Sequence, residues 1–161
     1  GDLRAGERTF QLLSQVAGRA GRAERPGRAL VQTVDPDNPA MIALAHRDRD
    51  GFLEIERTVR AEMGLPPYGR LAAVILSAPS ATMLEAVGLS LLKVAPNAEG
   101  VEVFGPAPAP IAVLRGRHRS RFLVQSPRQV DLSAYMAAWR DRMKLPAAVR
   151  VTIDIDPYSF L

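Results

Sequence analysis

Two arginines three residues apart, with glycines before them, close the first basic segment of the chain. The segment QVAGRAGR, residues 15–22, contains Gln15, Gly18, Arg19, Gly21 and Arg22. Glycine lets a backbone approach a ligand closely, and a guanidinium stays charged and offers a planar fork of donors. That fork suits the charge that spreads over a γ-phosphoryl group during its transfer. The spacing aims both arginines at one anion and indicates either arginine-finger chemistry or a solvated basic loop of a nucleic-acid binder.

A second basic cluster lies at the turn between two predicted strands. It consists of Arg115, Arg117, His118, Arg119 and Arg121. Side chains alternate along an extended strand, so Arg117, Arg119 and Arg121 are expected on one side, within reach of successive phosphates or of an acidic peptide. The alternative interpretation is an ordinary charged hairpin tip, since exposed turns are usually polar.

The composition narrows the kinds of site this chain can hold. The 161 residues carry a formal charge of +4 and are 47% hydrophobic, which predicts a globular protein with an anionic partner. With no cysteine and only His46 and His118, neither disulfides nor a thiolate or histidine metal site is expected. Asp154 and Asp156 lack a third ligand nearby and are expected at a solvent-facing edge. No apolar run suits a membrane span, so a soluble cytoplasmic protein is predicted.

The first third of the chain is predicted to be mostly helical. A helix over residues 7–16 runs into the basic loop and is followed by a strand, ALVQTV, over residues 29–34. Asn38 and Pro39 are typical of a helix start, and a further helix is expected from Asp50 to Gly64. Because nothing before the strand gives it a sheet, we expect the chain to start inside a larger domain. The domain boundary is placed just before Asp50, giving domains 1–49 and 50–161.

The rest of the chain alternates strands with helices. Strands are expected at residues 71–77, 101–104, 111–114, 121–125 and 149–155, and helices from Ser80 and from Ser126–Pro127. The GPAPAP segment, residues 105–110, is interpreted as a stiff connector, and Arg115–Arg119 as a turn. The order predicts an α+β domain: a mixed sheet of four or five strands with helices packed on one face, ferredoxin-like in outline.

Three aromatic side chains have competing interpretations. Trp139 and Tyr135 are able to stack on bases, but their helical spacing with Leu132 and Met136 favours core packing. Tyr68, in the LPPYGR turn at residues 65–70, is expected either to anchor a partner or to wedge between domains.

The pattern Q-x-x-G-R-x-G-R resembles motif VI of superfamily 2 helicases. Its context RAGERTFQLLSQVAGRAGR at residues 4–22, together with ALVQTV, LPPYGR, VFGPAPAPI, RGRHR and the terminal DIDPYSFL, resembles the PriA family of primosomal replication-restart helicases. The resemblance covers nearly the whole chain. It implies a C-terminal fragment that contains the tail end of a RecA-like helicase lobe (motif VI loop, last strand, linking helix) and a C-terminal domain with a ribosomal-protein-like fold.

The resemblance implies an ATP-dependent 3′–5′ DNA helicase that recognises stalled replication forks and begins primosome assembly. Gln15, Arg19 and Arg22 would face the nucleotide across the interlobe cleft, with Gly18 and Gly21 beside it and Arg22 as the finger. ATP, Mg²⁺ and zinc are expected cofactors of the longer parent. This chain contains neither G-x-x-x-x-G-K-[ST] nor D-E-x-H, so alone it is expected to be inactive.

The resemblance also implies partners for the C-terminal domain. These are forked and single-stranded DNA, the acidic C-terminal tail of single-stranded DNA-binding protein, and other primosome proteins, without a membrane and at the bacterial nucleoid. We expect Arg115 and Arg119 to contact DNA phosphates, and Arg117 and Arg121 to contact the tail. Two alternatives are a stand-alone nucleic-acid-binding module of ribosomal-protein-like fold and a scaffold that binds the tail without touching DNA.

Overall fold

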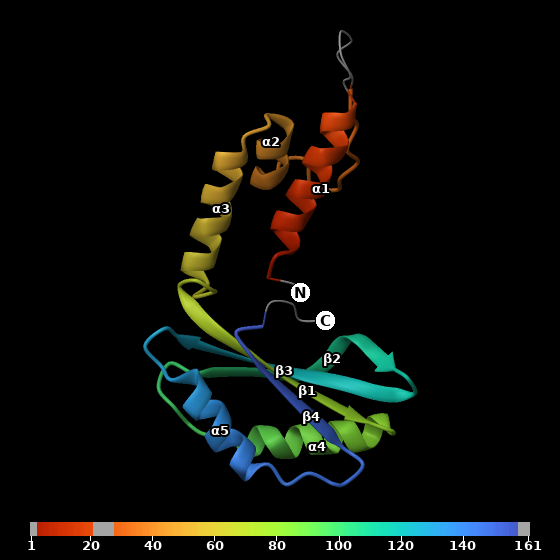
Figure 1. Cartoon of the computed structure of the whole chain (residues 1–161), viewed down its shortest axis with the longest axis vertical. Helices are drawn as coiled ribbons and strands as arrows, with labels where there is room; N and C mark the ends of the chain where they lie inside the picture. The colour runs from red at the N-terminus through yellow and green to blue at the C-terminus, as the bar shows by residue number, and fades with distance from the viewer. Residues whose placement is uncertain (1–2, 21–27, 158–161) are drawn as a thin grey trace. The chain divides into compact units, whose positions relative to one another are not determined.

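The computed structural model describes residues 3–20 and 28–157, and the chain divides into two compact units (Figure 1). Unit 1 is Gly1–Val59 and unit 2 is Arg60–Leu161. The division falls inside a helix, beyond the boundary expected before Asp50. No helix among the described residues is long and apolar enough to cross a bilayer.

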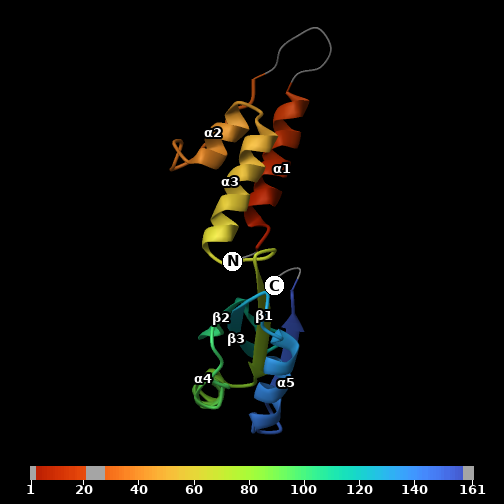
Figure 2. The ribbon, with the colours of Figure 1, turned by 90° about the vertical axis from the view of Figure 1, so that its left-hand side faces the viewer.

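Unit 1 is built from three helices, α1 (Ala5–Arg19), α2 (Pro39–Ala45) and the larger part of α3 (Arg49–Glu62). Asn38 caps α2 by accepting a hydrogen bond from the Ala40 amide at 3.0 Å. Pro39 has no amide hydrogen, but at the first helical position that hydrogen would have no partner within the helix. α1 and α3 lie side by side (Figure 2), with Phe10 stacked on Phe52 at 4.2 Å between ring centroids. The three expected helices are therefore confirmed.

The expected strand at residues 29–34 is wrong. Residues 28–33 form no regular secondary structure, and Leu30 and Val34 are exposed. A strand is stabilised by ladder hydrogen bonds to a neighbour, and no extended segment pairs with this one within the described residues. The assignment of residues 1–49 to a helicase lobe stays a prediction.

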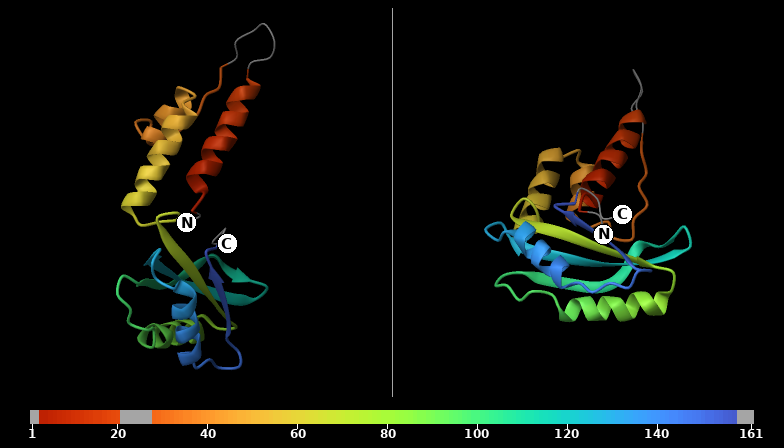
Figure 3. Two further views of the ribbon diagram at one scale, coloured as in Figure 1. Left: turned by 60° about the vertical axis from the view of Figure 1, so that its left-hand side comes forward. Right: turned by 60° about the horizontal axis from the view of Figure 1, so that its bottom comes forward.

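Unit 2 has a four-stranded sheet in the order β2-β3-β1-β4, with every pair antiparallel. Along the chain its elements are β1 (Gly69–Ala78), α4 (Ala81–Lys93), β2 (Glu102–Leu114), β3 (Arg117–Pro127), α5 (Leu132–Arg142) and β4 (Arg150–Ile155). Both helices cover the same face of the sheet (Figure 3). This βαββαβ order confirms the α+β, ferredoxin-like prediction, with an antiparallel rather than a mixed sheet.

The core of unit 2 lies between the helices and the sheet, and Trp139 is at its centre. Trp139 is fully buried, donates from Nε1 to the Leu91 carbonyl at 3.0 Å, and meets Phe122 edge-on at 5.4 Å. The Tyr135 hydroxyl donates to the Pro96 carbonyl at 2.9 Å, and burial raises the pKa of Tyr135. The prediction that both aromatic residues pack in the core is confirmed.

The GPAPAP segment is not a connector but part of β2. β2 is an edge strand, where a proline removes no hydrogen bond that the sheet needs. Its pairing with β3 shifts register between Phe104 and Ala107 and again between Pro108 and Val113. The helix expected to start at Ser126–Pro127 starts instead at Leu132, because β3 continues to Pro127 and Asp131 supplies the cap.

Candidate nucleic-acid interface

The turn of the basic hairpin consists of two residues, Arg115 and Gly116. Their φ angles are 51° and 73°, as a two-residue turn of type I′ requires. The turn is therefore shorter than the predicted Arg115–Arg119. Arg117 and Arg119 belong to β3, where the sheet fixes their direction.

β3 places its arginines on the sheet face opposite the helices. Ser120, Phe122, Val124 and Ser126 are buried against the helical layer, and the residues between them are half-buried. Alternation along the strand therefore puts Arg117, Arg119 and Arg121 on the open face, as predicted.

The sheet register extends this basic surface to a residue that the sequence pattern did not single out. Ser77 of β1 is the cross-strand partner of both Arg119 on β3 and Arg150 on β4. Direct cross-strand partners share a face, so the three side chains form a row across three strands. The row lies in a hollow of about 620 Å³. The hollow is lined by Ala73, Ile75, Ser77, Leu114, Arg115, Arg117, Arg119, Arg150, Thr152 and Asp154.

Ser77 and Arg150 were missed because they lie about 40 and 30 residues from the basic hairpin in sequence, and only the register joins them. One signal was available. Polar residues 150, 152 and 154 alternate with the apolar residues of β4, which marks them as the exposed side of that strand.

The arginines of the hollow differ in what they bond. Arg117 donates to Ser77 Oγ at 3.3 Å, to the Ser77 carbonyl at 2.8 Å and to the Ala148 carbonyl at 2.6 Å. The side chains of Arg115, Arg119 and Arg150 make no hydrogen bond or ion pair within residues 3–20 and 28–157. The hollow therefore contains three guanidinium groups available to a ligand and one that is engaged within the domain.

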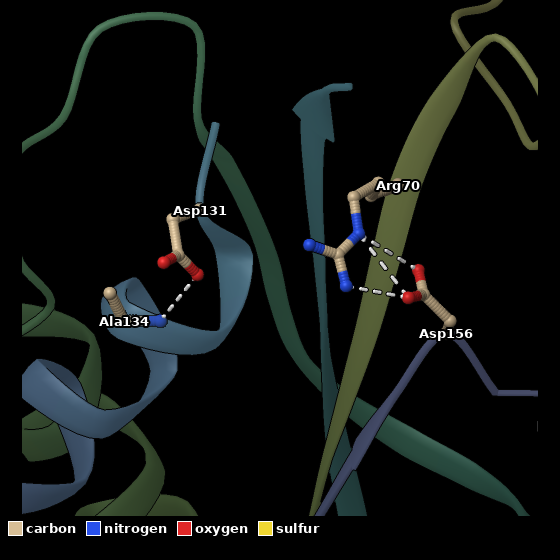
Figure 4. A network of polar contacts seen from close by, with 4 residues as sticks. All are labelled: Arg70, Asp131, Ala134 and Asp156. Atoms are coloured by element: carbon tan, nitrogen blue, oxygen red, sulfur yellow. Dashed lines mark hydrogen bonds and ion pairs between the residues drawn. The ribbon is translucent and has the colours of Figure 1, made fainter. Parts of the chain in front are cut away.

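The expected solvent-facing aspartates separate at the end of β4. Asp154 lines the hollow, whereas Asp156 pairs with Arg70, whose Nη2 lies 2.6 Å from Asp156 Oδ2 (Figure 4). The hydrogen bond to Asp156 raises the pKa of Arg70. The same view shows Asp131 Oδ1 accepting from the Ala134 amide at 2.9 Å. No three acidic or histidine side chains in the described part of the chain gather as a metal site.

Tyr68 is not among the residues that line the hollow. It belongs to the turn before β1, where its amide donates to the Leu65 carbonyl at 2.8 Å, and 39% of its surface is exposed. Its role as a partner contact stays a prediction.

Residues 15–19 of the QVAGRAGR segment lie on α1 of unit 1. Gln15 and Arg19 are exposed and four residues apart, hence on one face of the helix. Gln15 and Gly18 line an apolar hollow of about 750 Å³ between α1, α2 and the segment after residue 28. A Cβ at Gly18 would meet nothing within 4 Å, so no contact within the described residues requires glycine there. Gly21 and Arg22 lie outside the described residues.

Most of unit 2 matches a known domain family in sequence. Residues 61–158 match the family described as the primosomal protein N C-terminal domain, and the chain belongs to that family.

The similarity to full-length members extends through both units. Replication restart protein PriA of Rickettsia conorii is 38% identical over 159 residues, which cover 99% of this chain and 24% of that protein. PriA of Bacillus subtilis is 33% identical over 167 residues, covering 99% and 20%, and PriA of Haemophilus influenzae is 31% identical over 159 residues, covering 97% and 22%. The chain thus spans about a quarter of the length of these curated relatives or less.

Proposed function

We propose that this chain is the C-terminal part of an ATP-dependent 3′–5′ DNA helicase that recognises stalled replication forks and restarts replication through primosome assembly. One observation carries the proposal: relatives named replication restart protein PriA align with 99% of the chain, through the α1 motif as well as the C-terminal domain. A stand-alone nucleic-acid-binding module is not favoured, because it would account only for unit 2. Action at forks would place the protein in the bacterial cytoplasm, at the nucleoid.

In this proposal α1 contributes to the ATP site of the longer enzyme. Gln15 and Arg19 project from one exposed face of α1, and the Arg19 side chain makes no hydrogen bond or ion pair within the described residues, so its guanidinium is available to a phosphate. Arg22 remains our proposed finger. Bound ATP and Mg²⁺ would supply the phosphoryl chemistry, while these arginines would stabilise the charge on the γ-phosphate. Zinc ligands of the parent would lie outside these 161 residues, which contain no cysteine.

Unit 2 is proposed to bind the DNA of the fork. Arg115 and Arg119 carry charge on the open face of the sheet and are the proposed phosphate contacts. Arg117 and Arg121 were predicted to contact the acidic tail of single-stranded DNA-binding protein. A tail would have to compete for the Arg117 guanidinium with the Ser77 and Ala148 carbonyls.

A titration of the full chain with a labelled DNA fork tests the DNA-binding part of the proposal. We expect saturable binding that weakens steeply as salt rises, because phosphate contacts release counterions. A parallel titration with an acidic peptide ending in a hydrophobic residue tests the tail. Absence of fork binding at low salt would contradict the assignment of DNA to this domain.

The motor part is tested by Arg22→Ala in the longer helicase. We expect ATP binding to persist while DNA-stimulated turnover falls, because a finger acts on the transition state. Arg8→Ala, a charge removed from the same segment outside the motif, is the matched control. Equal turnover in Arg22→Ala and wild type would contradict the assignment of Arg22 as the arginine finger.

A further inference from the structure

The row Arg119–Ser77–Arg150 is the only part of the described open face where two unbonded guanidinium groups flank a hydroxyl. Neighbouring strands are about 4.8 Å apart, so the backbones that carry the two arginines are roughly 10 Å apart, with Ser77 midway. Arginine side chains are long enough to converge from both sides on an anion placed over the serine. The row therefore has the arrangement of an anion-binding site.

Arg117 determines what Ser77 offers to a ligand. A serine hydroxyl has one hydrogen to donate and two lone pairs to accept with. Because Arg117 Nε donates to Ser77 Oγ, the hydroxyl already acts as an acceptor towards the domain, and its own hydrogen is available to the hollow. The same guanidinium holds the Ala148 carbonyl, two residues before Arg150. Arg117 thus orients the serine and fixes the chain that leads to Arg150.

The lining of the hollow favours a phosphodiester backbone over bases or an acidic peptide. None of its lining residues is aromatic, so it has no platform on which a base would stack. Asp154 lies two residues along β4 from Thr152, on the same side as Arg150. A peptide with several carboxylates running along β4 would meet this charge. A backbone that crosses the strands at the row would meet only the arginines and the hydroxyl.

We propose that the Arg119–Ser77–Arg150 row binds a phosphate of the nucleic-acid backbone without reading base sequence, and that Arg117 is its positioning residue. This proposal rests on the DNA-binding function proposed above and adds Ser77 and Arg150 to the contact set. It also gives Arg117 a role that differs from direct contact with a partner.

The test measures affinity of the full chain for a labelled fork over a range of salt concentrations. Arg119→Gln and Arg150→Gln should each weaken binding about tenfold and reduce the slope of log K against log salt by about one, as loss of one phosphate contact does. The matched control is Arg142→Gln, an exposed arginine at the end of α5 on the helical side, which should bind like wild type.

Arg117→Lys separates positioning from charge. Lysine keeps the charge but cannot make the three forked bonds of Arg117, so affinity should fall severalfold while the salt slope stays at the wild-type value. Binding equal to wild type in Arg117→Lys would overturn the positioning role. A thermal melt of each variant, followed by circular dichroism, ensures that only folded protein is compared.

The outcomes distinguish this proposal from the one on which it rests. If wild-type chain does not bind the fork, the DNA-binding function itself fails. The proposal for the row fails, while the DNA-binding function stands, if wild type binds the fork and Arg150→Gln binds it with equal affinity. It also fails if the loss of affinity depends on the base sequence of the fork. If Arg150→Gln weakened binding of an acidic peptide but not of the fork, the proposal that the row binds phosphate would also be wrong.

Discussion

Replacing Trp139 by phenylalanine should destabilise unit 2 without altering its DNA-binding surface. Two losses are expected. The indole hydrogen bond to the Leu91 carbonyl disappears, at a net cost of about 1 kcal/mol, since that carbonyl still accepts from the Val94 amide. The smaller ring leaves a gap against Phe122, which costs about 1–2 kcal/mol more.

The sum of about 2–3 kcal/mol corresponds to a fall in melting temperature of about 10 °C or more for a unit of this size. Circular dichroism of the full chain measures it. Tyr135→Phe is the control, because it removes only the bond to the Pro96 carbonyl and should cost about 1 kcal/mol. An unchanged melting temperature in Trp139→Phe, together with weaker DNA binding, would refute the core assignment and make the indole a stacking surface. Quenching of the fluorescence of the single tryptophan in wild type by fork DNA would also indicate that the indole stacks on bases.

Three further predictions concern unit 2. Asp131→Ala removes the cap bond to the Ala134 amide and should lower the free energy of unfolding by about 1 kcal/mol in a urea titration, whereas Asp131→Asn should retain most of it. Burial raises the pKa of Tyr135 above 10.0 in the folded protein, so the neutral hydroxyl contributes its full stabilisation below the pKa of the unfolded chain and loses it as pH rises through the folded pKa. The free energy of unfolding of wild type should therefore fall from about pH 10 upward relative to that of Tyr135→Phe. Parallel plots of unfolding free energy against pH for the two proteins would contradict this. Gly105→Ala places a Cβ 2.7 Å from the Arg121 carbonyl oxygen at a φ of +115°, so we expect a loss of about 2 kcal/mol in a thermal melt, and an unchanged melt would show that the β2 edge adjusts freely.

The local pattern of the sequence was sufficient for most of unit 2. The apolar run of β1, the Ser80 cap of α4 and the buried face of α5 each reflect contacts with a single packed layer. Such contacts leave a period of two or of 3.6 residues in the sequence, which is why the α+β class and the Trp139 core were predictable.

The errors arose where a distant segment decides the structure. Residues 29–34 have the composition of a strand but no partner within the described residues, so they stay irregular. The prolines of GPAPAP suggested a break, yet an edge position lets β2 continue through them. The role of Arg150 depends on a register across three strands, which no local pattern encodes.

We expect DNA to bind the open face of the unit 2 sheet and not its helical face. Amide chemical-shift mapping of the isotope-labelled full chain during titration with a fork locates the binding face. We expect saturable shifts at Ser77, Arg119, Arg150 and Thr152, and little change along α4 and α5. Shifts concentrated on α4 and α5, with Ser77, Arg119 and Arg150 unperturbed, would show that DNA binds the helical face instead.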